Sequence, residues 1–277
     1  MGAALENYIR YIGESSSWAL GRFIVPVSRL SELEDGLGRF PQLPANGPWR
    51  FAALLGTDLA ADLELIDGFN RRGATRAPID TVEVKATSEN AVGEIIRLVP
   101  DSLQAYIEVP IDRDPSHLVA AIGRGGRRAK VRTGGVTREA FPHTEDLVRF
   151  LRATVQFAVP FKATAGLHHP LRATYRLTYA EDAPSGTMFG FLNLLLASAF
   201  LRSGMEEVEV VQLLEEDHPE AFQADASGFS WRNRRLELKS LSDARRHGMI
   251  SFGSCSFTEP IADLESLQLL APGVPQP

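Results

Sequence analysis

The chain has 277 residues, of which 44% are hydrophobic and 23% are charged, a balance that is typical of a globular protein with a sizeable core. The formal net charge of −6 argues against a general nucleic-acid-binding protein, which normally carries an excess of basic residues. A single cysteine, Cys255, excludes an internal disulfide and a metal site built from several cysteines. We predict no nucleic-acid partner, no metal and no other cofactor.

Membrane and targeting signals are weak. Residues 1–13 lack the basic flank and the long apolar run of a signal peptide. The most apolar stretch, residues 188–201, is shorter than the roughly 20 residues that cross a bilayer, and it is predicted to form a buried helix. We therefore expect a cytoplasmic protein with no membrane partner.

Seven short runs rich in apolar and β-branched residues are predicted to be strands. They lie at residues 22–30, 50–56, 81–87, 103–110, 129–135, 159–166 and 249–254. Helical periodicity separates or follows several of them, at residues 88–99, 115–126, 143–158 and 260–270. This alternation predicts an α/β fold with a parallel sheet. Because no G-x-G-x-x-G follows an early strand, we favour a (β/α) TIM-like barrel of seven or eight strands over a dinucleotide-binding sheet.

Residues 171–248 interrupt this rhythm. Residues 171–187 are polar and rich in turn formers, which indicates an extended loop or a short hairpin. Helical runs at 188–201 and 208–222 follow, then a hairpin around Arg232 and Asn233, then a helix at 240–248. We divide the chain into a barrel, residues 1–170 and 249–277, and a helical and hairpin elaboration of the same domain, residues 171–248. The elaboration is interpreted as a lid or as a contact between copies of the chain in a homo-oligomer.

Charged residues alternate with apolar ones in three of the predicted strands. Glu83 and Lys85 share one face of their strand, Lys130 and Arg132 share one face of theirs, and Lys162 and Thr164 share one face of a third. The outer face of a barrel strand packs against apolar helices, so these polar side chains should point inward. Active sites of such barrels lie at the C-terminal ends of the strands.

This placement predicts that Lys85, Lys130 and Lys162 meet at the barrel mouth, with Glu108 at the end of the fourth strand as a counter-charge. A buried lysine is costly unless it is paired, and crowded cations lower the pKa of an amine toward the nucleophilic neutral form. In a functional interpretation, Lys162 or Lys85 forms a Schiff base, or the cluster grips an anionic substrate. In a structural one, the lysines pair with Glu83 and Glu108 in a polar layer.

Residues 162–166, Lys-Ala-Thr-Ala-Gly, resemble the sixth-strand motif of the deoxyribose-phosphate aldolase group of class I aldolases. The resemblance covers about five residues. It implies a (β/α)8 barrel and a Schiff-base lysine at Lys162. The family pattern also has a second lysine on the seventh strand, which residues 249–254 lack, and an aspartate on the fourth strand, where this chain has Glu108. The missing roles would move to Lys130 and Lys85.

Two glycine-containing strand ends are candidate anion sites. Arg132, Thr133, Gly134 and Gly135 end the fifth predicted strand, where glycines let the backbone approach a phosphate, although a tight turn explains them equally well. Gly253 and Ser254 lie between the last strand and a helix N-terminus, an arrangement that binds phosphate or carboxylate in many barrels. The alternative is that Ser256 or Thr258 simply caps that helix.

His168 and His169 follow the sixth predicted strand. Neighbours on a strand point to opposite faces, and no H-x-H or H-E-x-x-H pattern supports a metal site. We predict that one of them, His168, is a general acid or base near Lys162 and that His169 contacts the substrate, together with Thr164. Either histidine could instead cap the sheet structurally.

Together these features predict an enzyme, aldolase- or lyase-like, that acts on a small anionic carbonyl compound, for example a phosphorylated sugar. Lys162, Lys130, Lys85, Glu108 and His168 would be catalytic, and Arg132, Gly135 and Ser254 would hold the anion. One alternative keeps the barrel but assigns a phosphoribosyl-transfer or isomerase reaction without a covalent lysine. The other is a non-catalytic binding or scaffold protein that uses residues 171–248 as its contact surface.

Overall fold

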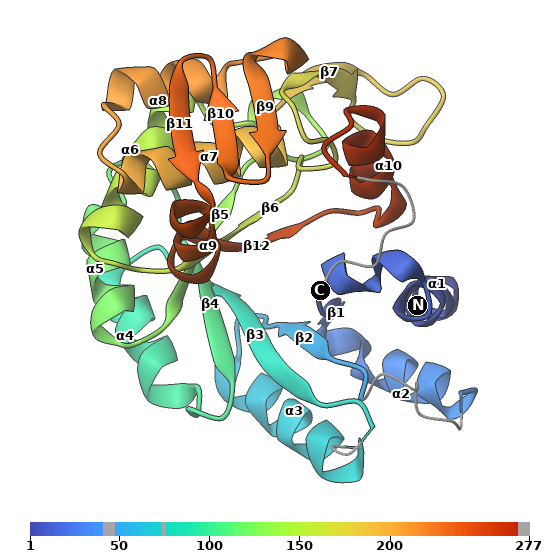
Figure 1. Ribbon diagram of the computed structural model, residues 1–277. Coiled ribbons are helices and arrows are strands. Elements are labelled where there is room, and N and C mark those ends of the chain that lie inside the picture. The colour runs from blue at the N-terminus through green and yellow to red at the C-terminus, as the bar shows by residue number, and fades with distance from the viewer. Residues whose placement is uncertain (41–47, 74–75, 271–277) are drawn as a thin grey trace.

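The computed structural model describes residues 1–40, 48–73 and 76–270. Within them, seven strands form one sheet in the order β1-β2-β3-β4-β5-β6-β12, and every neighbouring pair is parallel. The seven predicted strand runs are confirmed (Figure 1). The strands are β1 (Phe23–Pro26), β2 (Phe51–Leu54), β3 (Ile79–Lys85), β4 (Gln104–Glu108), β5 (Arg128–Arg132), β6 (Phe161–Thr164) and β12 (Met249–Gly253).

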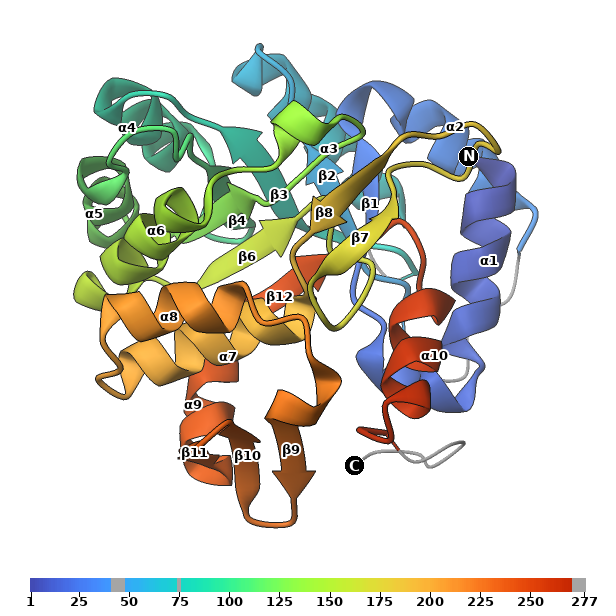
Figure 2. The same cartoon turned by 90° about the horizontal axis from the view of Figure 1, so that it is seen from above.

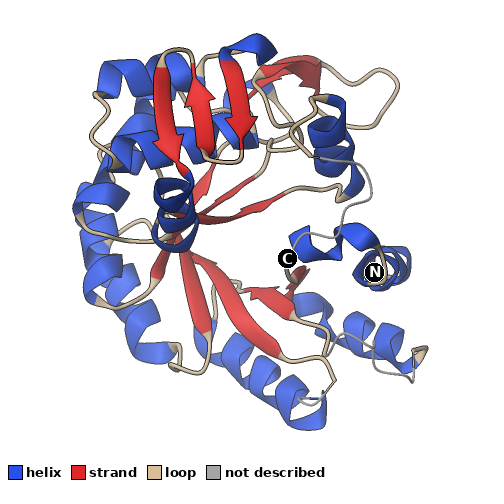
Figure 3. Ribbon diagram, in the orientation of Figure 1, coloured by secondary structure: helices blue, strands red, loops and turns tan. Residues whose placement is uncertain are grey.

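The sheet is curled into a half barrel with helices on its outer side (Figure 3). Its edge strands are β1 and β12, and no ladder joins these two edges within the described residues. The expected closed barrel is therefore not confirmed. Helices α1 (Gly2–Ile12) and α10 (Thr258–Ser266) lie on the open side, where the rings of Tyr11 and Phe257 are 4.9 Å apart (Figure 1).

Local sequence signals explain the helices that connect the first six strands. The Ser88 hydroxyl accepts a hydrogen bond from the Ala91 N–H at 3.2 Å and caps the next helix. Gly125 ends the following one, and two acidic residues occupy the first turn of the third. These helices are α2 (Leu30–Gly38), α3 (Leu59–Gly73), α4 (Glu89–Leu98), α5 (Ser116–Arg124) and α6 (Thr144–Gln156), with 3-10 turns at Ser15–Ala19, Val27–Arg29 and Arg138–Ala140.

Residues 171–248 form the connection from β6 to β12. Helix α7 (Phe191–Arg202) packs against α6, α9 and β12, so it covers the outer side of the sheet as a crossover helix would. In Figure 2, α7 and α8 lie side by side and the small sheet extends beyond them. The elements are β7 (Ala173–Arg176), β8 (Ser185–Met188), α7, α8 (Glu207–Leu214), β9 (Phe222–Asp225), β10 (Gly228–Trp231), β11 (Arg234–Glu237) and α9 (Leu238–His247).

Four predictions for this segment are confirmed and one is wrong. The helices predicted at residues 188–201 and 240–248 correspond to α7 and α9. Residues 171–187 include the β7–β8 hairpin, and Arg232 and Asn233 form the turn between β10 and β11. The helix expected over 208–222 ends at Leu214. Pro219 begins a separate 3-10 turn, Pro219–Ala221, and Phe222 then enters β9. The third strand of the small sheet was therefore missed. Among the described residues, no helix is long and apolar enough to cross a bilayer.

Candidate functional site

The register of the sheet places a row of charged residues on its concave face. Lys85 pairs with Glu108, Glu108 with Lys130, and Lys130 with Lys162 across four neighbouring strands. The alternate residues on these strands belong to the apolar core beneath the outer helices; they include Val82, Ile107, Val131 and Ala163. Because side chains on a strand alternate between faces, the charged row must face the hollow of the half barrel.

The side chains of this row form a network of ion pairs, which we call the lysine–glutamate cluster: Glu83, Glu108, Lys130 and Lys162. Lys130 Nζ is 2.8 Å from a carboxylate oxygen of Glu83 and 2.8 Å from one of Glu108. Lys162 Nζ is 2.6 Å from Glu83 Oε1. All four residues are buried. Two ammonium groups and two carboxylates thus alternate in space. Each buried charge lies next to an opposite charge, which offsets the free-energy cost of removing it from water.

The structure brings the three predicted lysines together on the concave face, but only Lys85 lies at the end of its strand. Lys130 is the middle residue of β5, and Lys162 is the second residue of β6. Lys85 Nζ is 3.8 Å from Glu108, but its side chain is 76% exposed, so it lies at the rim of the cluster rather than inside it. Glu83 was missing from the predicted catalytic set, although it contacts both buried lysines. The signal was present in the sequence, because the alternation in residues 81–87 already placed Glu83 on the face of Lys85.

Electrostatics perturb the two central groups in ways that matter chemically. Burial raises the pKa of the Glu83 carboxyl, but the charges of Lys162 and Lys130 outweigh burial and hold that pKa below its ordinary value. Burial lowers the pKa of the Lys162 ammonium; Glu83 opposes this change, while Lys130 and Arg22 add to it, and the pKa remains below its ordinary value. Glu83 is therefore ionised at neutral pH, and Lys162 releases its proton more readily than a lysine in water.

The immediate surroundings of Lys162 are small, aromatic or hydroxylated. Its Nζ lies 5.8 Å from the centre of the Tyr106 ring. The hydroxyl oxygen of Thr164 is buried and has no hydrogen-bond partner among the described residues. A Cβ on Gly253 would lie 3.2 Å from Thr164 Cγ2 and 3.8 Å from Lys162 Cε, so the glycine lets β12 come close to the lysine. The predicted residues Thr164 and Gly253 therefore adjoin Lys162.

The end of β5 is mostly occupied by protein packing. The buried Thr133 hydroxyl donates a hydrogen bond to the Ala165 carbonyl at 2.7 Å and ties this strand end to that of β6. A Cβ on Gly134 would lie 2.4 Å from the Phe141 ring, and one on Gly135 would lie 2.7 Å from Ala140 Cβ. The two glycines are thus explained by a close loop rather than by a ligand. Arg132, by contrast, is exposed.

The histidines lie in a second group, which fastens helix α10. His168 Nδ1 is 3.2 Å from Ser254 Oγ, and His169 Nδ1 is 2.6 Å from Asp263 Oδ2. Burial lowers the pKa of His168, while Glu259 partly opposes that change. Within the part of the chain that the structure describes, no recorded contact joins either histidine to the lysine–glutamate cluster. The predicted role of His168 beside Lys162 therefore gains no support from the geometry.

The polar residues after β12 cap helix α10, which was the alternative to an anion site at Gly253 and Ser254. The Ser254 hydroxyl accepts a hydrogen bond from the Ser256 N–H at 3.3 Å. The Ser256 hydroxyl in turn accepts one from the Glu259 N–H at 3.2 Å, which is a capping contact at the start of α10. These polar groups are satisfied within the chain, so the turn after β12 needs no anion.

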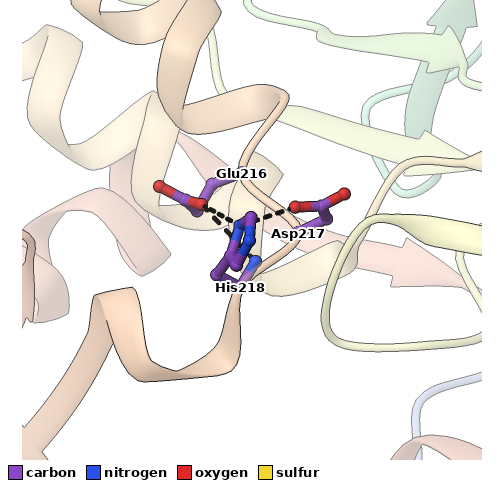
Figure 4. Close-up of side chains that lie close together, drawn as sticks. All are labelled: Glu216, Asp217 and His218. Atoms are coloured by element: carbon purple, nitrogen blue, oxygen red, sulfur yellow. Dashed lines mark hydrogen bonds and ion pairs between the residues drawn. The ribbon is translucent and has the colours of Figure 1, made fainter.

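Glu216, Asp217 and His218 form a further group of potential ligand atoms that the sequence did not indicate (Figure 4). His218 Nδ1 is 2.8 Å from Asp217 Oδ1 and 3.2 Å from Glu216 Oε1. Glu216 is buried and already accepts hydrogen bonds from Trp231 Nε1 at 3.2 Å and Arg232 Nε at 2.8 Å. Its carboxylate therefore serves to anchor the small sheet to the end of α8.

Comparison with protein-family models, with curated proteins and with solved structures finds no match to this chain. A functional assignment therefore depends on the chemistry of the concave face. The composition of the chain supports attention to this face. Only four of its 29 basic residues are lysines, and three of these four lie in or beside the lysine–glutamate cluster.

Proposed function

We propose that the protein is a lyase of the class I aldolase type that acts on a small anionic carbonyl compound through a Schiff base at Lys162. The observation that carries the proposal is the placement of lysines in a chain that otherwise uses arginine as its cation. A guanidinium stays protonated in proteins, whereas a buried lysine can become a neutral amine. Lys162 is buried, and the pKa of its amine lies below the ordinary value because of burial.

The contact between Lys162 and Glu83 supplies the proton transfers of imine formation. Glu83 Oε1, 2.6 Å from Nζ, accepts a proton from the ammonium, and the neutral amine then attacks the carbonyl carbon of the substrate. The attacking nitrogen then passes one of its two protons to the carbonyl oxygen, which gives a neutral carbinolamine, and Glu83 returns its own proton to the hydroxyl, which leaves as water. The resulting iminium withdraws electrons from the bond between its α and β carbons. When the β-hydroxyl of the substrate gives its proton to Glu83, which is again a carboxylate, this bond breaks to an aldehyde and a neutral enamine.

Lys130 assists the proton transfer between Lys162 and Glu83. Its ammonium contacts Glu83 and Glu108 at 2.8 Å each, and its charge helps to hold the pKa of the Glu83 carboxyl below its ordinary value. It also adds to the lowering of the Lys162 pKa, which follows mainly from burial. In the resemblance to deoxyribose-phosphate aldolases, we assign to Lys130 on β5 the role of the second lysine, since β12 carries none. Lys85 and Arg132, both exposed near the strand ends, would receive the anionic group of the substrate.

A non-covalent reaction is the second candidate, for example phosphoribosyl transfer or isomerisation. The observation that favours it is the fixed position of Lys130 between two carboxylates. A cation held in this way can stabilise a developing negative charge without forming a bond. In that reaction Lys162 would serve only as an electrostatic partner of Glu83.

Reductive trapping distinguishes the two candidates. The protein is incubated with glycolaldehyde, pyruvate or dihydroxyacetone phosphate and sodium borohydride, and the adduct is located by peptide mass spectrometry. The proposal predicts one adduct, on Lys162, that disappears in the variant Lys162→Met and persists in Lys239→Met, since Lys239 is exposed on α9. Absence of an adduct across this panel, or equal labelling of Lys162 and Lys239, would rule out the Schiff-base lyase.

A further inference from the structure

A cleft of about 690 Å³ lies between the β5–α6 connection and the β7–β8 hairpin, and none of the four lysines lines it. Its volume is within the range of sites that hold small molecules. Phe141, Pro142 and Phe189 provide apolar walls. The Phe141 ring also packs against Gly134 and Gly166 at the ends of β5 and β6, so a protein side chain stands between these strand ends and the cleft.

Two arginines, Arg138 and Arg172, line the cleft. Arg172 is half-buried, and its backbone N–H donates to the Asn193 side chain at 3.0 Å, which fixes the position of its backbone. Its guanidinium has no ion-pair partner within the described residues, although a partly buried charge is costly without one. Arg138 uses its Nε to donate to the Ser185 carbonyl at 2.6 Å, so its two terminal nitrogens remain able to bind an anion.

The other polar groups of the cleft suit a hydroxylated ligand. Glu145 and Glu215 line it, and both are exposed carboxylates that can accept hydrogen bonds from ligand hydroxyls. Glu215 Oε1 accepts one from the Thr144 hydroxyl at 2.8 Å, which holds that carboxylate in place. A bare anion would gain from the arginines but be repelled by the glutamates, whereas a molecule with an anionic end and a hydroxylated end complements both pairs.

We propose that this cleft binds a small hydroxylated anion, a sugar phosphate or a sugar acid, with its anionic group on Arg138 and Arg172 and its hydroxyls on Glu145 and Glu215. The site is separate from the lysine–glutamate cluster and does not depend on a Schiff base. Phosphate and carboxylate share the chemistry that two guanidiniums recognise, so the two sources are separated by experiment.

Isothermal titration of the full chain with sorbitol 6-phosphate, gluconate, sorbitol and inorganic phosphate tests the proposal. None of these probes carries a carbonyl that could react with Lys162. We expect sorbitol 6-phosphate or gluconate to bind, and sorbitol and inorganic phosphate to bind more weakly. Whichever of the first two compounds binds more tightly shows whether the site prefers a phosphate or a carboxylate. Arg172→Ala should weaken the binding by about tenfold or more, the loss expected for a charged hydrogen-bond donor.

Matched variants separate this site from other causes. Arg176→Ala, which removes an exposed arginine from β7 outside the cleft, should bind as the unchanged protein does. Glu145→Gln should weaken the binding of the hydroxylated anion but not that of inorganic phosphate. Lys162→Met should retain binding, and Arg172→Ala should retain borohydride trapping at Lys162, so failure of one site is distinguishable from failure of the other.

Three results would overturn the assignment: no binding of either hydroxylated anion, equal binding by Arg172→Ala and Arg176→Ala, or sorbitol binding as tightly as sorbitol 6-phosphate. Thermal unfolding of each variant shows whether it is folded. If Arg172→Ala does not fold, Arg172→Gln decides the same question, because it keeps a long polar side chain and removes the charge.

Discussion

Replacing Glu83 by glutamine should destabilise the protein in a way that depends on pH. The Glu83 side chain is 1% exposed and holds the ammonium groups of Lys162 and Lys130 at 2.6 Å and 2.8 Å. In Glu83→Gln the lysine–glutamate cluster keeps both lysines but loses one of its two carboxylates. One positive charge is then buried without compensation, a change that typically costs about 3–5 kcal/mol of unfolding free energy.

Proton release sets an upper limit to that cost. A lysine whose ordinary pKa is 10.5 can be neutralised at pH 7 for about 5 kcal/mol, at about 1.4 kcal/mol per pKa unit, and at pH 9 for only about 2 kcal/mol. The variant lowers the folded-state pKa of Lys162 further below the unfolded value. The penalty is therefore complete at pH values below the folded pKa and is relieved as the pH rises toward 10.5.

Urea unfolding followed by circular dichroism at pH 7 and pH 9 measures this difference, with reversibility checked by refolding. We expect a loss of about 3–5 kcal/mol at pH 7 that falls by at least about 1 kcal/mol at pH 9. Glu32→Gln is the control, since Glu32 pairs with Arg29 on the surface and such pairs contribute about 0–1 kcal/mol. A Glu83→Gln variant as stable as the control, or a loss that does not change between the two pH values, would refute the reasoning.

Two further predictions concern ion pairs outside the cluster. Burial raises the pKa of Asp80, but hydrogen bonds from Arg22 and Arg50 outweigh burial and lower this pKa to about 2. The variant Asp80→Asn should therefore lose about 1–2 kcal/mol of unfolding free energy at pH 7. Acid titration of both proteins should show this difference vanishing as the pH falls through 2. Glu216→Gln should lose about 2–4 kcal/mol, because Glu216 is buried and accepts from Trp231, and hydrogen exchange should increase in β9–β11. Zinc or a chelator should leave the melting temperature of the unchanged protein where it is; a rise with zinc would mean that the Glu216 group is a metal site.

The parts of the fold that could be predicted are those set by local pattern. Strand runs, helix caps such as Ser88 and the turn at Arg232 depend on residues near one another in the sequence, and they were found. The openness of the sheet could not be predicted, because it depends on whether β1 and β12 pair across the whole chain. Strand β9 was missed because the signal at residues 219–222 is brief and follows a strong helical pattern.

The site shows the same division. Period-two alternation placed Lys130 and Lys162 on inward faces, and Glu108 was placed by its position at the end of its strand. Parallel pairing brings the three residues together. Whether Gly134 contacts a ligand or a side chain could not be decided from spacing, because the occupant, Phe141, lies in a loop whose path has no periodic signal. The contacts of His168 were equally hidden, since they depend on where α10 docks.

Stability alone gives little reason for a chain to keep charges where the lysine–glutamate cluster lies. Replacing a buried ion-pair network by apolar residues of similar volume is often neutral or stabilising by about 1–4 kcal/mol. A purely structural network would also favour arginine, which this chain uses at 25 of its 29 basic positions and which binds carboxylates through two parallel hydrogen bonds. The cluster instead contains the basic side chain that can lose its proton, next to a carboxylate 2.6 Å away that can accept it. The use of lysine here favours proton transfer over packing as the reason for the arrangement. Lys162→Arg is therefore the most informative variant, because the protein should keep the positive charge and most of its stability while losing the borohydride adduct.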